Sequence, residues 1–429
     1  MSTLLDILLI TIGSIVAFKA YKSIVFNRTK SVSDYVIMVI YVFCIIPILF
    51  NYLIGVPTYQ TVYWYKVFSG PMINSRVAII YDLFIMFTIL LLWFYSKKQY
   101  ARVNNEPKAV NNSKNIHIFE SGFLSYVLIL SPLLIILLTG TFKNYLTFNL
   151  ASTRGLSENA SAAFMSPLLL LSLFTFFCKY YKDKITIKKF FLSIPYFFLI
   201  VWISGKRFML ANIILLLVYY VCNSNLSEKS RKRLYCFFPI LFLILLAFSA
   251  MYLTKIRPLS DTTSSSVYEM LRVDFGRDDV IKYVIDQEII KGNRILEYRG
   301  ESMLSMILFW IPRSMWPNKP YPHYRYLTSS ILSLPVDQLP AGTTPSWFEM
   351  CICNFGLIGF ILAPLLLLLF CKLSDSESSL DIKAIYLILL TVLLTQCMDV
   401  YVIYIMVILI AKLYLMFFKN KQIRFIWRT

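Results

Sequence analysis

Residues 77–95 read VAIIYDLFIMFTILLLWFY, and residues 348–370 read FEMCICNFGLIGFILAPLLLLLF. A helix needs roughly 20 consecutive apolar residues to cross the hydrocarbon core of a bilayer, and both runs approach or reach that length. By the same criterion, about eleven such runs recur along the chain. They lie near residues 4–18, 35–55, 77–95, 122–140, 161–179, 188–203, 208–222, 235–254, 348–370, 382–397 and 400–418. The sequence therefore predicts an all-α polytopic membrane protein with about eleven transmembrane helices.

The composition agrees with this class. Of the 429 residues, 58% are hydrophobic and only 15% are charged, whereas a soluble domain needs a polar surface. The first apolar run, residues 4–18, has neither a basic segment before it nor a small-residue cleavage site after it. We therefore expect it to be a membrane span and not a signal peptide. The cysteines lie in or beside apolar runs without metal-binding spacing, so we expect neither a disulfide framework nor a metal site.

The net charge of +19 would indicate a nucleic-acid partner in a soluble protein. In a membrane protein, lysine and arginine gather in cytoplasmic loops, so we expect no nucleic acid here. The loops after the first, third, fifth and seventh runs carry basic clusters, and the intervening loops carry only pairs of basic residues. The clusters are Lys19/Lys22/Arg28/Lys30, Lys97/Lys98/Arg102/Lys108/Lys114, Lys179/Lys182/Lys184/Lys188/Lys189 and Lys229/Arg231/Lys232/Arg233. This alternation predicts a cytoplasmic C-terminus and an outside N-terminus.

The same alternation of loops between the two sides of the membrane divides the chain into three parts. Residues 1–254 hold the first eight helices, residues 255–347 form one large extracytoplasmic loop with short helices, and residues 348–429 hold three helices and a cytoplasmic tail. Within the loop, apolar residues from Val280 to Ile289 recur at helical spacing among charges, which predicts a short amphipathic helix. Residues 188–203 and 208–222 are short and are joined only by a Ser-Gly-Lys-Arg turn. They form either a tight hairpin or one re-entrant element.

Arginine is the most informative residue type, because its planar fork binds phosphate through two parallel hydrogen bonds and keeps its charge. Arg207 stands in the turn between two apolar runs, with no acid within twenty residues on either side. It either binds an anion or extends to the membrane interface. For Arg272, Arg277 and Arg294 we expect ion pairs with neighbouring acids.

Four further motifs follow one another in or beside the loop. They are Arg299-Gly-Glu301, IPRSMWPNKP at residues 311–320, GTTPSWFE at 342–349 and NFGLIG at 354–359. Proline and tryptophan restrict the backbone of the second motif, so Arg313 and Lys319 should be held in place. Glu349 falls in the first turn of a helix, where the helix dipole alone explains a carboxylate. The same position would suit a base that meets a sugar hydroxyl.

Together with the Ser-Gly-Lys-Arg turn, these motifs resemble those of the Wzy-type O-antigen and capsule polymerases. The motif resemblance covers roughly residues 200–360, and the first half of the chain agrees only in hydropathy. It implies a GT-C-like architecture in the bacterial cytoplasmic (inner) membrane, without a cofactor or a required metal. It also implies the reaction, in which a glycan passes from undecaprenyl pyrophosphate to a second lipid-linked oligosaccharide repeat unit. The partners implied are these lipid-linked oligosaccharides, membrane lipids, a chain-length regulator and a flippase.

Sugar transfer outside the cell has no nucleotide sugar to draw on, so cationic groups that stabilise a leaving pyrophosphate become the main catalytic device. On this interpretation, pyrophosphate binds to Arg207, Arg299 and Arg313, with Lys319 and Arg325 as further candidates. Glu349 or His323 would accept the proton of the acceptor hydroxyl, and Asp274 and Asp399 stay open as alternatives.

Two other functions compete with this one. An O-antigen ligase resembles the polymerases in topology, and a histidine in the outer loop such as His323 is typical of ligases. A lipid-linked oligosaccharide flippase or other transporter would place ionisable groups in mid-membrane. The apolar runs hold few such groups, of which Asp82 and Lys412 are the clearest. The order of the proline-rich motifs favours the polymerase.

Overall fold

A computed structural model of the chain describes residues 2–27, 31–60, 63–105, 122–145, 160–181, 187–205, 207–224, 226–251, 264–339, 342–377, 379–398, 402, 404–406 and 408–409. Within these ranges every regular element is a helix. The first half holds α1 (Ser2–Phe26), α2 (Val32–Ile40), η1 (Tyr41–Ile45), α3 (Ile46–Leu53), η2 (Tyr63–Phe68), α4 (Ser69–Ile73), α5 (Ser75–Asn105), α7 (Gly122–Leu138), η3 (Thr141–Tyr145), α8 (Ala160–Tyr180), α9 (Ile187–Ser204) and α10 (Arg207–Asn223). The second half holds α11 (Glu228–Met251), α12 (Ser264–Phe275), α13 (Asp278–Ile285), η6 (Asp286–Ile290), α14 (Glu301–Ile307), α15 (His323–Leu332), η7 (Val336–Gln338), α16 (Trp347–Phe355), η8 (Gly356–Ile358), α17 (Gly359–Asp375) and α18 (Leu380–Thr395).

Four helical stretches are long and apolar enough to cross a membrane: Ser2–Phe26, Val32–Leu53, Ser75–Ala101 and Trp347–Asp375. Shorter apolar helices cover Gly122–Leu138, Met165–Tyr180 and Phe208–Asn223. The all-helical class and its compatibility with a membrane are therefore confirmed, whereas the count of about eleven spans remains a prediction. α9 ends at Ser204 and α10 begins at Arg207, so these are two separate helices, and they contact each other.

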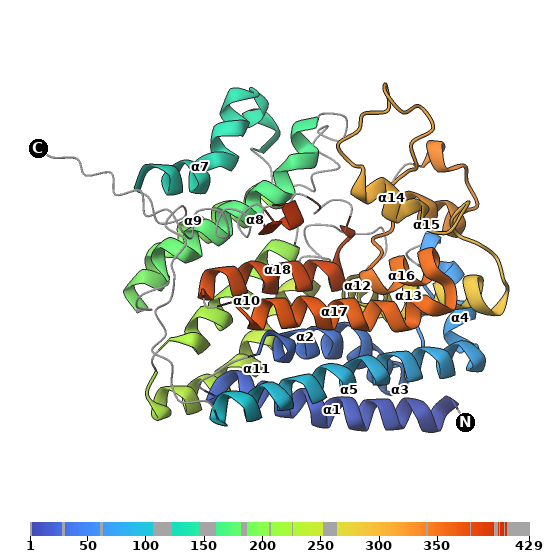
Figure 1. The fold of residues 1–429 in the computed structure, drawn as a ribbon, viewed down its shortest axis with the longest axis horizontal. Helices are drawn as coiled ribbons and strands as arrows, with labels where there is room; N and C mark the ends of the chain where they lie inside the picture. The colour runs from blue at the N-terminus through green and yellow to red at the C-terminus, as the bar shows by residue number, and fades with distance from the viewer. Residues whose placement is uncertain are drawn as a thin grey trace, which may run out of the picture.

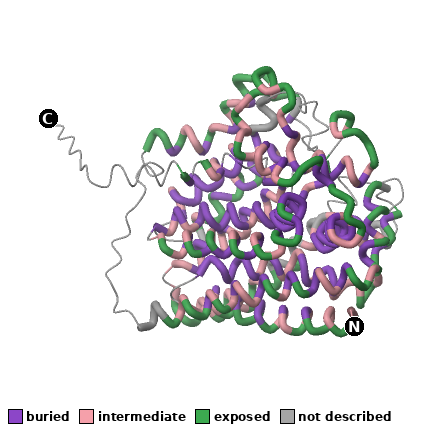
Figure 2. The backbone as a smooth tube through the Cα atoms, turned by 45° about the vertical axis from the view of Figure 1, so that its right-hand side comes forward, coloured by how far each residue is buried: buried purple, intermediate pink, exposed green. Residues whose placement is uncertain are grey.

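The helices α1, α2, α5, α17 and α18 lie side by side along the longest axis of the molecule (Figure 1). α18 carries apolar residues on every face and is buried along nearly its whole length. Burial is concentrated at the centre of the bundle, and the outermost helices carry the exposed positions (Figure 2). Many exposed residues of α1 and α5 are large and apolar, as expected for helix faces in contact with lipid.

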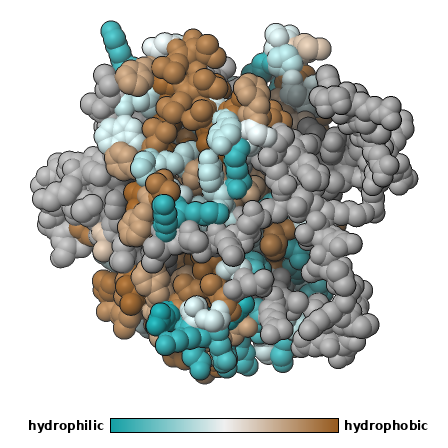
Figure 3. Space-filling view, turned by 90° about the vertical axis from the view of Figure 1, so that its left-hand side faces the viewer, coloured by the Kyte–Doolittle hydropathy of each residue, from teal (hydrophilic) through white to brown (hydrophobic). Residues whose placement is uncertain are grey.

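The two ends of the bundle differ in charge. At one end, which we name the basic end, Lys19 of α1 and Lys97 of α5 both lie over the Trp93 ring. Arg231 of α11 joins them there and donates to the Val25 carbonyl oxygen at 2.7 Å. Seen from this side, hydrophilic side chains form patches on a surface whose other described residues are mostly apolar (Figure 3). Helix ends with basic clusters therefore gather in space, as the alternation along the sequence predicts.

The opposite end carries the charge-rich segment. Asp6, near the start of α1, accepts a hydrogen bond from Tyr52, and Asn74 donates to Asp286 of η6 at 3.4 Å. The N-terminus of α1 and residues 264–339 thus share one end of the bundle, which we name the cavity end. The segment is not an open loop there, because all eight residues of α13 are buried against α4, α5 and α16. The predicted amphipathic helix is confirmed as α13 followed by η6.

Buried ionic groups hold this segment in place. Arg272 pairs with Asp278 at 2.9 Å, so the predicted ion pair of Arg272 is confirmed. Lys282 lies 3.9 Å from the same carboxylate and 4.9 Å above the Tyr81 ring of α5. Arg277 instead donates to two backbone carbonyls, as described below. A buried charge is tolerated only with such partners, so the network ties α12 and α13 to the bundle.

The run at 348–370 is not one straight helix. Its first part, α16, ends at Phe355, and Gly356 takes a positive φ of 61° that turns the chain at η8. The Trp347 indole donates to the Ala363 carbonyl oxygen at 3.3 Å. In a straight helix, residues sixteen positions apart would be separated by about 24 Å. α16 and α17 therefore fold back on each other as a helical hairpin.

Candidate functional site

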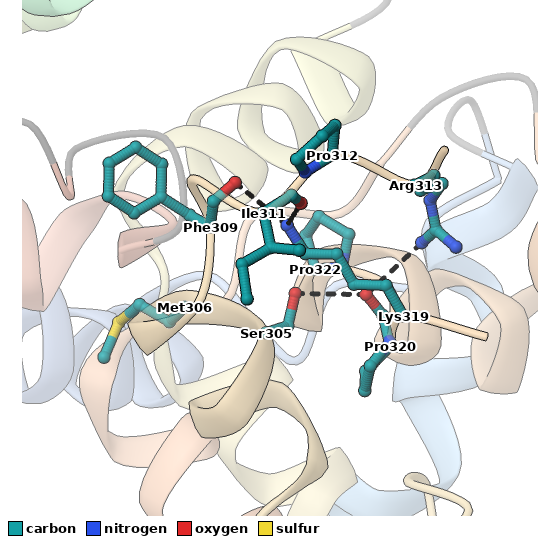
Figure 4. Close-up of a pocket in the computed structure, with 9 residues that line it drawn as sticks. All are labelled: Ser305, Met306, Phe309, Ile311, Pro312, Arg313, Lys319, Pro320 and Pro322. Atoms are coloured by element: carbon teal, nitrogen blue, oxygen red, sulfur yellow. Dashed lines mark hydrogen bonds between the residues drawn. The ribbon is translucent and has the colours of Figure 1, made fainter. Parts of the chain in front are cut away.

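A cavity of about 290 Å³ lies at the cavity end, between α14 and the start of α15 (Figure 4). Its walls come from the end of α14 and from the proline-rich segment that follows. The lining residues are Ser305, Met306, Phe309, Ile311, Pro312, Arg313, Lys319, Pro320 and Pro322. The motif IPRSMWPNKP thus encloses a small cavity together with α14.

Proline geometry and a few hydrogen bonds shape this cavity. The rings of Pro312 and Pro320 restrict the backbone, so the segment loses little conformational freedom on folding. The Pro320 carbonyl oxygen accepts from the Ser305 hydroxyl at 3.1 Å and from the Arg313 guanidinium at 3.3 Å (Figure 4). The Lys319 ammonium donates to the carbonyl oxygens of Phe309 and Ile311 at 2.9 and 2.8 Å. The cationic groups are positioned, as predicted.

The cavity carries positive charge, and no acid in the described ranges pairs with it. Among the described residues, no carboxylate lies within 4.0 Å of Arg313, Lys319 or Arg325. Arg313 and Arg325 both lie over the Tyr321 ring, at 4.0 and 5.3 Å from its centroid. Burial lowers the pKa of the Lys319 ammonium from its usual value, and the nearby Arg313 charge lowers it further. An anion in the cavity would relieve this repulsion.

Arg299 lies apart from the cavity, at the turn of the helical hairpin. It pairs with the buried Glu288 carboxylate at 2.7 Å. Its guanidinium also donates to the carbonyl oxygens of Cys353 and Ile352 at 2.5 and 3.3 Å. These carbonyls end α16, where a cation complements the helix dipole. The described contacts of Arg299 are those of a residue that holds the hairpin, not of one that lines the cavity.

Glu349 is the third residue of α16 and forms a capping box with Ser346. Its carboxylate accepts from the Ser346 backbone nitrogen at 3.0 Å and from the Ser346 hydroxyl. The side chain is buried and does not line the cavity. Nearby, Arg277 donates to the carbonyl oxygens of Thr344 and Thr395, at 2.9 and 2.6 Å, so that three chain segments meet beside the start of α16. The dipole explanation for Glu349 therefore agrees with its contacts.

His323 begins α15 and is buried behind the cavity wall, with Nδ1 3.0 Å from the Ser302 hydroxyl. Burial lowers the pKa of its imidazole to about 3. A general base works best when its pKa is near the working pH, so this environment disfavours His323 as the proton acceptor. Its contacts instead join α14 to α15.

We expect His323 to make folding stability depend on pH. Its pKa is about 3 in the folded chain and 6.5 ordinarily, so on acidification the unfolded chain binds a proton first. The free energy of unfolding should fall as the pH drops below 6.5, by about 1.36 kcal/mol per pH unit. At pH 5 the loss should be about 2 kcal/mol. Thermal unfolding of wild type and His323→Asn at pH 7 and pH 5 measures this difference. Equal pH dependence of the two proteins would contradict the prediction.

Breaking the Arg299–Glu288 pair should destabilise the hairpin. Arg299→Met leaves a fully buried carboxylate without its partner, which we expect to cost about 2 kcal/mol because Arg299 itself is partly exposed. The double variant Glu288→Gln/Arg299→Met should recover part of the loss. Lys232→Met, which breaks an exposed pair in α11, is the matched control and should change the thermal midpoint little. If Arg299→Met changed the thermal midpoint as little as Lys232→Met does, the Arg299–Glu288 pair would not stabilise the hairpin.

The remaining predicted residues divide as follows. Arg325 does not line the cavity, but it lies over the same Tyr321 ring as Arg313 and donates to the Val336 carbonyl oxygen at 3.5 Å. Arg207 starts α10, and its side chain lies outside the described part of the structure, as do Asp399 and the side chain of Asp274. Sequence reasoning missed Ser305, which lines the cavity, and Tyr321, whose ring contacts Arg313 and Arg325, because both contacts depend on the return of the proline-rich segment to α14.

In the described ranges, no three His, Cys, Asp or Glu residues gather where they could hold a metal ion. Comparison with protein families, with curated proteins and with solved structures finds nothing that matches this chain. The geometry of the cavity end therefore carries the functional argument, together with the motif resemblance.

Proposed function

We propose that the protein is a Wzy-type polysaccharide polymerase of the bacterial inner membrane. It would transfer a glycan from undecaprenyl pyrophosphate to a lipid-linked oligosaccharide repeat unit, with the cavity end outside the cytoplasm. The observation that carries the proposal is the cavity itself, where carbonyl groups hold Arg313 and Lys319 and no carboxylate of the described residues pairs with either cation. The basic clusters at the opposite end support the orientation.

The cavity suits the leaving group of this reaction. Rupture of the glycosyl–phosphate bond develops negative charge on pyrophosphate, and fixed cations stabilise that charge without reorganising. A volume of about 290 Å³ is at the small end of ligand sites and accommodates a head group, not a glycan chain. The sugar and the acceptor would then lie outside the cavity.

None of the lining residues is an acid or a histidine, so the acceptor base is not part of the cavity wall. Glu349 remains the candidate that we test. Glutamine at this position keeps the capping box and removes only the charge. If Glu349 is the base, Glu349→Gln should slow polymerisation about 10²-fold or more without changing thermal stability.

Ser346→Ala is the matched control for that variant. It removes the cap hydroxyl and leaves the carboxylate, so stability should fall by about 1 kcal/mol while polymerisation continues. Both are measured with purified protein and lipid-linked repeat units, followed on gels that resolve product ladders. Full activity of Glu349→Gln would exclude Glu349 as the base.

The proposed function is tested by reconstituting the full chain with lipid-linked repeat units. Formation of products longer than one repeat unit supports a polymerase. Transfer of a unit only to a non-prenyl acceptor would identify a ligase instead. In cells, loss of a polymerase should leave acceptors capped with one unit, and loss of a ligase should leave none capped.

A flippase for lipid-linked oligosaccharides is the second candidate. The helical hairpin α16–η8–α17 favours it, because broken helices are typical of transporters. Accumulation of repeat units on the cytoplasmic leaflet in a deletion strain would support this candidate over the polymerase.

A further inference from the structure

Exposed apolar side chains lie beside the cationic cavity, on the segment that forms it. Ile307 and Trp310 are each 65% exposed, and Met315 is 77% exposed. They alternate along the chain with the positioned cations Arg313 and Lys319. Large apolar side chains grouped on a protein surface mark a contact with a membrane or another protein.

A second exposed apolar group lies at the turn of the helical hairpin, where Leu357 is 69% and Ile358 is 63% exposed. The hairpin is bound to the cavity segment just before this turn. The Asn354 amide donates to the Ser302 hydroxyl of α14 at 2.6 Å, and the Met303 backbone nitrogen donates to the Asn354 side chain at 3.3 Å. The two apolar groups therefore belong to adjoining elements.

The turn is continuous with a lipid-facing stripe on α17. Ile361, Leu365 and Leu369 are exposed and recur every four residues, so they lie on one face of this helix. The stripe begins at the turn, so if α17 crosses the bilayer, the edge of the hydrocarbon layer would lie there. In Figure 1 the chain between α14 and α15 rises away from the bundle, across the direction of its horizontal helices. If those helices cross the bilayer, this direction lies in the plane of the membrane.

We propose that residues 307–316 and the 356–358 turn are seated in the bilayer leaflet at the cavity end, at the boundary between head groups and acyl chains. Trp310 then occupies the depth that tryptophan prefers in membrane proteins, and the cavity that Arg313 and Lys319 line lies at the level of the head groups. The partner is the lipid leaflet, because the apolar side chains alternate with cations that complement lipid phosphates. The cavity would open to the membrane and not to bulk water. This placement does not depend on the proposed reaction.

Fluorescence quenching in lipid nanodiscs tests the placement. The chain has seven tryptophans, so the emission of Trp310 is obtained as the difference between wild type and Trp310→Phe. We expect lipids brominated near the glycerol to quench most of that difference and aqueous iodide to quench little of it. Adding Leu357→Trp to the Trp310→Phe background reports on the turn in the same way.

Quenching by iodide and not by brominated lipid would overturn the proposal, because the segment would then face water. Quenching by neither reagent would also overturn it, because the side chain would be covered by protein. Neither readout requires enzymatic activity. A chain that polymerises nothing but shows lipid quenching would contradict the proposed function alone, and an active chain quenched only by iodide would contradict the membrane seat alone.

Discussion

Replacing Arg313 and Lys319 together with alanine should abolish polymerisation. Removing one group that stabilises developing negative charge typically slows a reaction about 10²- to 10³-fold. The double variant should therefore polymerise roughly 10⁴-fold more slowly than wild type. The physical reason is that no acid among the described residues forms an ion pair with Arg313 or Lys319, so both cations are available to an anionic ligand. The measurement is the rate of ladder formation from lipid-linked repeat units.

Two controls separate catalysis from folding. Arg294→Ala removes an exposed arginine of the same charge-rich segment and should leave the rate unchanged. Lys319 also ties the segment to the Phe309 and Ile311 carbonyls, so its variant is accompanied by thermal unfolding. Lys319→Arg keeps the charge and should retain most of the activity. A double variant that is folded and polymerises at the normal rate would remove the cavity from the mechanism.

Gly359→Ala should strongly destabilise the protein. A Cβ atom at Gly359 would lie 2.3 Å from the Cys351 carbonyl oxygen and 2.8 Å from the Ile352 Cα atom. Both are backbone atoms, which cannot rotate away as a side chain can. We expect a loss of about 3 kcal/mol, at the upper end for overpacking, because the two arms of the hairpin must separate.

The matched control is Gly122→Ala, at the start of α7, where an added Cβ would meet no atom within 4 Å. Thermal midpoints of both variants are compared with wild type by size-exclusion chromatography of heated, detergent-solubilised protein. Gly122→Ala should keep the wild-type midpoint. If Gly359→Ala also kept it, the close approach of α16 to α17 would not exist in the protein.

Only some of the site residues that the motifs predict lie at the cavity. The sequence pointed to Arg313 and Lys319 because prolines and tryptophan surround them, and the structure brings both to one cavity. The sequence motifs assigned Arg299 and Glu349 to the same site. In the structure, Arg299 holds the hairpin turn and Glu349 caps α16. Motif order along a chain carries no distances, so residues with different partners appeared as one constellation. His323 looked available in sequence, and only the structure shows that it is buried, which lowers the pKa of its imidazole.

The sequence by itself determined that α5 is a helix long and apolar enough to cross a membrane, and that basic clusters gather at one end of the bundle. A lipid-exposed segment must satisfy its backbone hydrogen bonds internally, so length and hydropathy alone specify a helix. Only the tertiary structure decided the form of residues 347–375, because a straight span and a folded hairpin have the same hydropathy. The close contact at Gly359 selects the hairpin. Likewise, the burial of α13 depends on pairing Arg272 with Asp278, and that pairing exists only once α12 and α13 pack against the bundle.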